Sequence, residues 1–217
     1  MAEEKRNIRR RILSFRNEMP LKLREEKSNI IIRTLYEMER YKKAEIILTY
    51  ADYQSEVITT PLISRALTEN KQVFTPRVCS VYGEEMKSEK MEFYRISDIE
   101  DLEEGYKGIR EPVYGEDFME KIVSYKASGK KASGDAASVL MLIPGVVFDK
   151  DGHRIGYGKG FYDRYLKRMT EAGINAYKIA LCYECQMLSE VPHENHDISV
   201  DMVITENGIY EKGNKYE

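Results

Sequence analysis

The chain has 217 residues, of which 42% are hydrophobic and 33% are charged, and its formal net charge is −3. This composition is typical of a folded globular protein and excludes a disordered chain, while the negative charge does not favour a strongly basic nucleic-acid binder. No apolar run reaches the length of a membrane span, and the start of the chain is too charged for a secretory signal. With only three cysteines, we expect a cytoplasmic protein that spans no membrane.

Residues 4–19 are predicted to form a basic helix that ends before Pro20, because proline cannot continue a helix. Residues 1–24 contain eight Lys or Arg and three Glu, so this segment carries +5 and the rest of the chain −8. Lys5 and Arg9 are four residues apart, share one helix face and are able to grip one anion together. Three interpretations stay open: a solvated helix face, an arm that binds RNA or a membrane surface, and an arm that folds back onto an anion held by its own protein.

Helices and strands alternate along the rest of the chain. Helices are predicted over residues 21–41, from a Thr59 cap to Asn70, and over 161–172 before Gly173. Buried strands are predicted over residues 44–50, 72–75 (ended by Pro76), 139–143, 177–183 and 202–205. This order indicates a three-layer α/β/α fold with a mostly parallel central sheet covered on both faces. Ligands of such sheets bind beyond the carboxyl ends of the strands.

The connecting segments differ in composition. Residues 77–96 are expected to form two extended arms around Gly83, and residues 97–118 an irregular segment. Residues 126–138 are small and polar, which is typical of a flexible surface loop. Because the sheet needs strands from both sides of this loop, we interpret the loop as an insertion and the whole chain, residues 1–217, as a single domain.

The segment from Arg154 to Asp163 (RIGYGKGFYD) is the strongest candidate for a functional site. Glycines allow sharp turns and close approach of a ligand, and backbone N–H groups at the following helix start attract anions. Lys159 and Arg154 add positive charge, and Asp163 adds a hard oxygen ligand, so the segment has the parts of a polyphosphate–magnesium site. It is neither a P-loop, because Gly160 follows the lysine, nor a dinucleotide fingerprint. The alternative interpretation is a glycine-rich turn with solvated charges and aromatic residues that pack in the core.

Two cysteines and two histidines lie close together near the end of the chain. Cys182 and Cys185 form a C-x-x-C pair, and His193 and His196 follow within a few residues. This set suggests a zinc site, but the interval between the pairs is short for a zinc finger and Cys182 falls in a predicted buried strand. We therefore interpret Cys182 as a packed apolar residue and do not expect structural zinc.

Several of these residues match a known family. Residues 142–149 (LIPGVVFD) and 152–163 (GHRIGYGKGFYD) closely resemble the signature of the 5-formyltetrahydrofolate cyclo-ligase family, also called methenyltetrahydrofolate synthetases. The resemblance extends over nearly the whole chain, since four weaker matches follow in family order: Lys5-x-x-x-Arg9, the segment from Tyr50 to Glu56, Glu111-Pro112, and Val191-Pro192 to Asp197. It implies a fold similar to that of sugar-phosphate isomerases and CoA transferases.

The resemblance also implies roles for individual residues. ATP contacts correspond to Lys5, Arg6, Asn7, Ile8, Arg9, Arg154, Ile155, Gly156, Tyr157, Gly158, Lys159, Gly160, Phe161 and Tyr162. Folate contacts correspond to Arg9, Ala51, Glu56, Tyr157, Gly158, Lys159, Gly160 and Phe161, and magnesium ligands to Asp163 and Asp197. The expected catalytic residues are Lys159, Arg154 and Tyr162. Without the resemblance, Glu56 is more simply interpreted as an exposed loop carboxylate and Tyr162 as a packing residue.

The implied reaction converts 5-formyltetrahydrofolate and ATP to 5,10-methenyltetrahydrofolate, ADP and phosphate, with Mg²⁺. In this reaction the formyl oxygen is phosphorylated and N10 then attacks the activated carbon. The protein therefore needs to position the substrates and to neutralise negative charge. This agrees with a chain in which no nucleophile–base motif is found. We expect a monomer with small-molecule substrates and no nucleic-acid or membrane partner. The alternatives are an isomerase or CoA transferase on the same fold, which needs a general base and no nucleotide, and an RNA-binding module that uses the basic helix.

Overall fold

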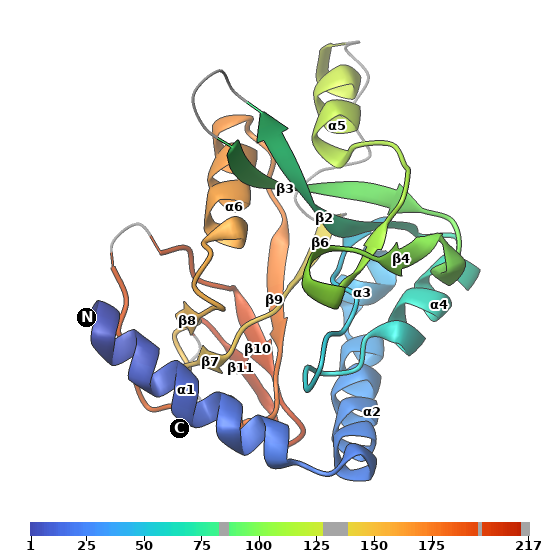
Figure 1. Cartoon of the computed structure of the whole chain (residues 1–217). Helices are drawn as coiled ribbons and strands as arrows, with labels where there is room; N and C mark the ends of the chain where they lie inside the picture. Colours follow the sequence, from blue (N-terminus) through green and yellow to red (C-terminus); the bar gives the residue numbers. More distant parts are fainter. Residues whose placement is uncertain (83–86, 128–138, 195–196, 214–217) are drawn as a thin grey trace.

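A computed structural model describes residues 1–82, 87–127, 139–194 and 197–213. Its centre is a seven-stranded sheet with the order β11-β10-β9-β6-β1-β2-β3 (Figure 1). The strands are β1 (Ile46–Leu48), β2 (Gln72–Tyr82), β3 (Lys87–Ile96), β6 (Val139–Ile143), β9 (Tyr177–Leu181), β10 (Met202–Ile204) and β11 (Ile209–Glu211). The strands of the first half (β1 to β3) and of the second half (β6, β9 to β11) join in this one sheet where β1 pairs with β6, which supports the expected single domain, although that stays a prediction.

The five inner strands are parallel and the two edge strands are antiparallel. β1 pairs in parallel with β2 and β6, and Leu48 lies opposite both Phe74 and Met141. β9 pairs in parallel with β6 and β10, whereas β3 and β11 run antiparallel to their neighbours. The parallel strands place their carboxyl ends at one edge of the sheet, where the chain leaves β1 and β6 to build the candidate site.

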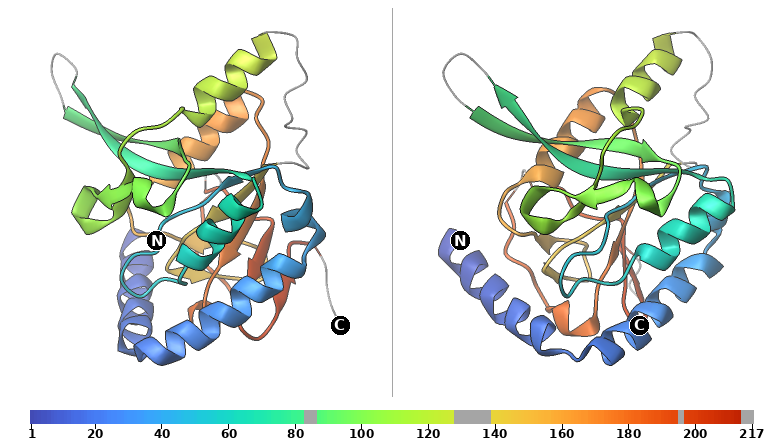
Figure 2. Two further views of the ribbon diagram at one scale, coloured as in Figure 1. Left: turned by 90° about the vertical axis from the view of Figure 1, so that its right-hand side faces the viewer. Right: turned by 45° about the vertical axis from the view of Figure 1, so that its right-hand side comes forward.

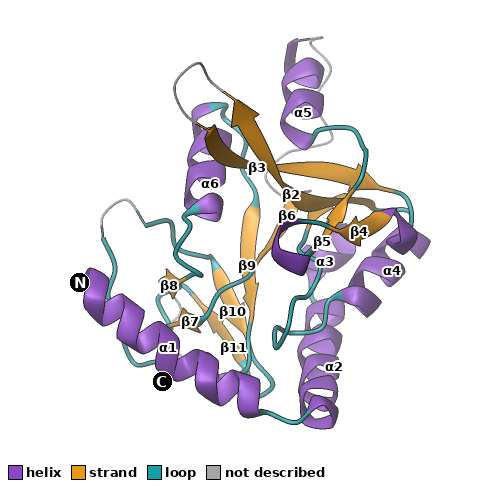
Figure 3. Cartoon of the chain, viewed as in Figure 1, coloured by secondary structure: helices purple, strands orange, loops and turns teal. Residues whose placement is uncertain are grey.

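Helices cover both faces of the sheet (Figure 3). Ile47 of β1 faces the apolar sides of α2 (Leu21–Glu37), α3 (Glu39–Lys43) and α4 (Thr60–Thr68). Its neighbours Ile46 and Leu48 face α5 (Phe118–Ala127) and α6 (Phe161–Glu171) on the opposite side. This alternation buries both faces of β1, as expected for a parallel strand with helices on either side. The predicted fold class, a mostly parallel sheet flanked by helices, is confirmed.

The first helix, α1 (Ala2–Glu18), lies outside these layers. In two further views α1 and α2 meet near Pro20 and curve around one end of the molecule (Figure 2). Ile12 of α1 is buried in a third apolar cluster with Val146, Val147, Ile155 and Val191. These partners belong to, or lie beside, a small antiparallel hairpin of β7 (Val147–Phe148) and β8 (Arg154–Ile155). The packing fixes α1 against the start of the glycine segment.

Several helix predictions need correction. The helix expected over residues 21–41 ends at Glu37, because Met38 has extended backbone angles, and a short second helix follows. Thr59 makes no side-chain capping bond. Instead, Asp52 from the preceding loop accepts hydrogen bonds from the backbone N–H groups of Thr59 and Thr60, at 2.9 and 3.0 Å. The cap is therefore supplied from outside the helix, where local sequence rules do not find it.

Predictions on the strands and loops also need correction. β2 continues through Pro76 to Tyr82, because beyond Phe74 the strand pairs with β3 alone and a missing N–H is tolerated. The segment expected to be irregular contains β4 (Leu102–Glu104) paired with β5 (Arg110–Pro112), and two 3₁₀ turns, η1 (Ile99–Asp101) and η2 (Tyr106–Gly108). Residues 126 and 127 belong to α5, while the rest of the predicted flexible loop and the Gly83 turn lie outside the described residues.

No helix in the part of the chain that the structure describes combines the length and apolar composition needed to cross a membrane.

Candidate active site

A cavity of about 670 Å³ opens at the carboxyl ends of the parallel strands. Ala51 and Glu56 follow β1, Pro144 follows β6, and all three line it. The glycine segment between β8 and α6 forms another wall, which includes every residue from Arg154 to Arg164. The cavity therefore lies where open parallel sheets hold their ligands, and the segment singled out in the sequence is part of it.

Two glycines of the segment have backbone angles that favour glycine. Gly158 has φ +95° and Gly160, which precedes α6, has φ +65°. The Arg9 guanidinium lies over Gly158, 3.5 Å from where a Cβ would stand, and Arg9 Nε donates a hydrogen bond to the Gly156 carbonyl oxygen at 2.7 Å. Burial lowers the pKa of Arg9. A Cβ at Gly158 would stand in ordinary van der Waals contact with Arg9, so the positive φ, and not a lack of space, favours glycine there.

One face of α1 turns toward the cavity. Lys5 and Arg9 both line it, which favours the interpretation of the basic arm as one that folds back onto its own protein. The intervening residues lie outside the cavity lining: Arg6 contacts Glu3, Asn7 accepts from Arg10, and Ile8 packs against the third apolar cluster. Among the residues of this helix that are expected to contact ATP, only Lys5 and Arg9 line the cavity.

The two candidate magnesium ligands line the same cavity, and each is paired with a cation. Asp163 Oδ1 accepts from Arg154 Nη2 at 2.7 Å, and Asp197 Oδ2 accepts from Lys5 Nζ at 2.6 Å. Arg154 is buried and also donates to the Ile198 carbonyl oxygen, so its side chain joins α6 to the segment that carries Asp197. Carboxylate oxygens on two converging segments are the donors that Mg²⁺ prefers, so these residues fit the ion.

Glu56 is a buried carboxylate in the cavity wall and not an exposed loop residue. Its Oε1 accepts from the Tyr157 hydroxyl at 2.5 Å and its Oε2 from the Tyr53 N–H at 3.1 Å. Burial raises the pKa of Glu56, and the Tyr157 hydrogen bond and the charge of Arg16 oppose this rise. A carboxylate with one partner on each oxygen keeps lone pairs for a ligand with two N–H groups.

Tyr162 and Lys159 complete the set of predicted catalytic residues at the cavity. The Tyr162 hydroxyl is buried and has no hydrogen-bond partner among the described residues, while its ring packs edge-on against Phe93. A buried hydroxyl without a partner is costly, so a ligand group that pairs with it gains affinity. Lys159 is half exposed, and its Nζ lies 3.8 Å from Glu89 Oε2.

Other cavity residues were not predicted from the sequence. The η2 segment and β5 contribute Tyr106, Lys107, Ile109 and Glu111, and the hairpin of β2 and β3 contributes Val78 and Met91. Apart from Glu111, which is part of the Glu111-Pro112 match to the family, no local pattern marks these residues, because long-range pairing brings them to the site. Arg16, which contacts Tyr157 beside the cavity, had a usable signal: with Lys5, Arg9 and Ile12 it follows the spacing of one helix face.

The structure does not bring the zinc candidates together within the described residues. Cys182 is buried beside Met187, whereas Cys185 is exposed. The close group of possible ligands found there is Asp149, Asp151 and His153, and neither cysteine belongs to it. Asp149 in this group accepts backbone N–H bonds and so organises a turn. His193 stacks on His153 with ring centroids 3.6 Å apart, and His196 lies outside the described residues.

The fold and the cavity are typical of an α/β enzyme, and the cavity combines a glycine-rich segment with buried carboxylates. Comparison with known proteins identifies the family. The model of the 5-formyltetrahydrofolate cyclo-ligase family matches residues 1–206. The 5-formyltetrahydrofolate cyclo-ligase of Mus musculus is 28% identical over 207 residues, 94% of each chain, and that of Saccharomyces cerevisiae is 30% identical over 169 residues, 71% of this chain and 72% of the yeast protein.

A solved structure agrees with these relatives. The NMR structure of the 5,10-methenyltetrahydrofolate synthetase of Aquifex aeolicus superposes with a TM-score of 0.74 at 28% identity, and covers 98% of this chain and 95% of that one. The chain therefore belongs to the 5-formyltetrahydrofolate cyclo-ligase family and is an enzyme of this class. The resemblance found in the sequence is confirmed, and family membership argues against the isomerase, CoA-transferase and RNA-binding alternatives.

Proposed function

We propose that the protein cyclises 5-formyltetrahydrofolate to 5,10-methenyltetrahydrofolate, uses ATP and Mg²⁺, and releases ADP and phosphate. The observation that carries this proposal is one cavity that the glycine segment, the cations of α1, Glu56 and two acidic side chains all line. Neighbouring residues of the segment contact both sets of groups, since the Gly156 carbonyl holds Arg9 and the Tyr157 hydroxyl holds Glu56. This supports a shared wall between a nucleotide and a folate.

The reaction needs activation because a formyl oxygen is a poor leaving group. In the proposed sequence this oxygen attacks the γ-phosphorus of ATP, the bond to the β-phosphate oxygen breaks, and ADP leaves. N10 then adds to the activated carbon and loses its proton, and the former formyl oxygen departs as part of inorganic phosphate, which takes up that proton. Neither step requires a covalent bond to the protein, which suits a cavity equipped with cations, backbone N–H groups and hydrogen-bond donors.

The residues take roles that follow from their surroundings. Arg9, Lys159 and the N–H groups around Gly158 and Gly160 neutralise the phosphates, as at other glycine-rich helix starts. Glu56 accepts hydrogen bonds from the N–H edge of the pterin ring, and Ala51 leaves room beside it. The Tyr162 hydroxyl, which has no hydrogen-bond partner among the described residues, donates to the formyl oxygen.

The two candidate magnesium ligands also have roles in the proposed reaction. Asp163 and Asp197 would hold Mg²⁺, which stabilises negative charge on phosphate oxygens when it is bound. Arg154 orients Asp163, and Lys5 orients Asp197. A cytoplasmic, monomeric enzyme with no nucleic-acid or membrane partner completes the proposal. The free state of all three cysteines suits a reducing compartment.

One assay tests the proposal. Purified protein is mixed with 5-formyltetrahydrofolate, ATP and Mg²⁺, and the methenyl product is followed by its absorbance while ADP is measured in parallel. We expect one ADP for each methenyl product, and no product when ATP is left out. Product formation without ATP, or ATP hydrolysis without product, would contradict the proposal.

A further inference from the structure

Arg16 is a buried cation that the proposed reaction does not use. Only 1% of the residue is exposed, although Arg10 and Arg11 on the same helix are exposed. Its guanidinium donates to three segments: to Ser55 Oγ at 2.9 Å, to the Gly145 carbonyl oxygen at 3.3 Å and to the Tyr157 hydroxyl at 2.7 Å. A buried charge persists only where it is well paired, so the arrangement of its acceptors indicates what it does.

The Tyr157 hydroxyl links Arg16 to a carboxylate in the cavity wall. The Tyr157 hydroxyl accepts from Arg16 and has a single hydrogen, which it donates to Glu56 Oε1. A hydroxyl that accepts from a cation becomes a stronger donor, and a strong donor favours the charged form of its carboxylate partner. Arg16, Tyr157 and Glu56 therefore form a chain in which each bond strengthens the next.

The other titratable groups that face Glu56 do not favour its charge, and the Tyr53 backbone N–H does. Tyr50 and Tyr162 lie close enough for their phenol groups to interact electrostatically with it, and Asp52 is a like charge on the same loop. The Tyr53 N–H is its second hydrogen-bond donor. Among the described groups that favour ionised Glu56, Arg16 is the positive charge that acts on it, and it acts without touching the carboxylate.

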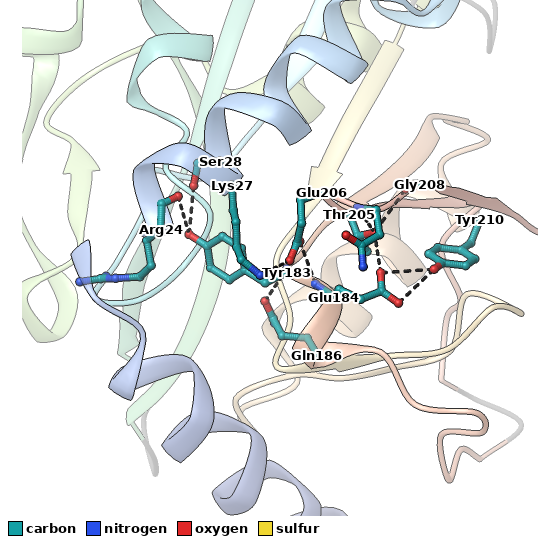
Figure 4. Close-up of polar contacts among 11 residues, drawn as sticks. Arg24, Lys27, Ser28, Tyr183, Glu184, Gln186, Thr205, Glu206, Gly208 and Tyr210 are labelled. Carbon is teal, nitrogen blue, oxygen red and sulfur yellow. Dashed lines mark hydrogen bonds and ion pairs between the residues drawn. The ribbon is translucent and has the colours of Figure 1, made fainter. Parts of the chain in front are cut away.

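The backbone of Glu56 is held separately. The Tyr183 hydroxyl donates to the Glu56 carbonyl oxygen at 3.1 Å and lies 3.0 Å from Ser28 Oγ, which in turn accepts from the Ile58 N–H at 3.1 Å. Figure 4 shows Tyr183 and Ser28 facing each other across this contact. Two different systems therefore fix the loop and the carboxylate, and loss of Arg16 leaves the contacts of the backbone system in place.

We propose that Arg16 is a positioning residue, which acts through the Tyr157 hydroxyl to keep Glu56 ionised and aimed at the N–H edge of the folate substrate. The inference rests on the proposed role of Glu56. It also explains why one helix spans the site, because Lys5 and Arg9 serve the phosphate groups and Arg16 serves the pterin end.

The consequence is a defined dependence on pH. Burial already raises the pKa of Glu56, and Arg16 counteracts this rise. Removal of Arg16 moves the pKa of Glu56 further up, so the carboxylate becomes protonated at a higher pH and binds the folate less well there. The KM for 5-formyltetrahydrofolate then increases as the pH falls, and this increase begins at a higher pH in the variant than in the wild type.

The test compares Arg16→Met, Arg16→Lys, Tyr157→Phe and the double variant Arg16→Met/Tyr157→Phe. Ser55→Ala is the matched control, because it removes another acceptor of Arg16 and leaves the link to Glu56 intact. For each protein the melting temperature, kcat and the KM values for folate and ATP are measured from pH 6 to pH 8. Melting curves identify variants that are folded at the assay temperature.

We expect Arg16→Met to raise the folate KM at pH 6 by about tenfold or more, as for loss of one hydrogen bond in a charged network, with little change in the ATP KM. Arg16→Lys should restore part of the pH profile because it keeps the charge. Tyr157→Phe should shift the profile in the same direction, and the double variant should be no worse than the more affected single variant. Ser55→Ala should lower only the melting temperature.

A folded Arg16→Met enzyme with the wild-type pH profile of folate KM would overturn the inference, as would additive effects in the double variant. Should Arg16→Met not fold, the same decision rests on Arg16→Lys and Tyr157→Phe. Failure of the proposed function is distinguishable, because the wild-type protein itself would then give no ATP-dependent methenyl product.

Discussion

Lys5 near the start of the chain and Asp197 near its end form an ion pair, with Lys5 Nζ 2.6 Å from Asp197 Oδ2. The second candidate magnesium ligand has a parallel arrangement, since Arg154 pairs with Asp163 at 2.7 Å. Each carboxylate therefore has a cation from its own chain, which limits the repulsion between two acids in one cavity. In the proposed site, a bound Mg²⁺ would share these carboxylates with the protein's own cations.

Asp163→Asn and Asp197→Asn are each expected to raise the Mg²⁺ concentration for half-maximal activity by about tenfold or more, because an amide oxygen carries no charge. The measurement is initial rate against free Mg²⁺ at saturating ATP. Asp98→Asn is the matched control, since Asp98 is exposed and is not a lining residue of the cavity. Coincident Mg²⁺ curves for wild type and both cavity variants would remove these residues from the metal site.

Lys159→Ala is expected to lower kcat about a hundredfold, the usual effect of removing one preorganised charge partner of a transition state. Its side chain is half exposed, and among the described residues its ion pair is a long one of 3.8 Å with Glu89, so the melting temperature should hardly change. Lys167→Ala, an exposed lysine on α6 that pairs with Glu171 at 4.0 Å, is the control. A kcat near that of the wild type in Lys159→Ala would argue against a role in phosphoryl transfer.

The sequence was sufficient for the five parallel strands of the sheet and for the cavity wall that lies in one continuous segment. Strand 139–143 and the start of α6 at Phe161 are strong local signals, because an apolar run and a glycine-to-helix transition need no tertiary information. The predicted ends of helices and strands were wrong where contacts with residues distant in the sequence determine them. Asp52 caps α4 in place of Thr59, and Pro76 is tolerated because only one side of β2 is paired there.

The rest of the site depends on contacts that no local pattern encodes. Glu56 becomes buried because Tyr157, about a hundred residues later, lies over it. The cavity wall from η2 and β5 forms only when the hairpin of β2 and β3 turns across α6. Arg16 was predictable in part. The residue spacing indicates that it shares a helix face with Lys5 and Arg9, but it does not indicate the three acceptors of its guanidinium group.

Glu56→Gln should bind folate less well than the wild type. Its stability relative to the wild type should nevertheless increase as the pH rises. Burial raises the folded-state pKa of Glu56 above its ordinary value of 4.5. The stability linked to its protonated form is present below pH 4.5 and is lost as the pH rises through the raised pKa, whereas glutamine does not ionise. The melting temperature of the variant minus that of the wild type should therefore increase from pH 4.5 to pH 8.

Melting curves of Glu56→Gln at several pH values test this, together with the folate KM. Glu103→Gln, at an exposed position on β4, is the control and should give a difference that does not change with pH. If the melting temperature of Glu56→Gln minus that of the wild type decreased with rising pH, the folded state would favour the ionised Glu56.

Arg168→Met should destabilise the protein through Glu92 and not through the active site. Glu92 is 3% exposed, and its two oxygens accept from Arg168 Nη1 and Nη2, both at 2.7 Å. Removing one partner of a buried pair costs roughly 3–5 kcal/mol, but Arg168 is 40% exposed and solvent screens it, so we expect about 2 kcal/mol. Urea unfolding at pH 7 measures the loss, and Lys167→Met on the same helix is the control.

The pH dependence of that loss has a fixed sign. Burial raises the pKa of Glu92, but the hydrogen bonds from Arg168 and Lys90 outweigh burial and hold it below 4.5. The stability from this pair is therefore present above pH 4.5 and is lost as the pH falls through the lowered pKa. The difference in unfolding free energy between wild type and Arg168→Met should narrow below pH 4.5, and a constant difference would show that Arg168 acts by packing and not by charge.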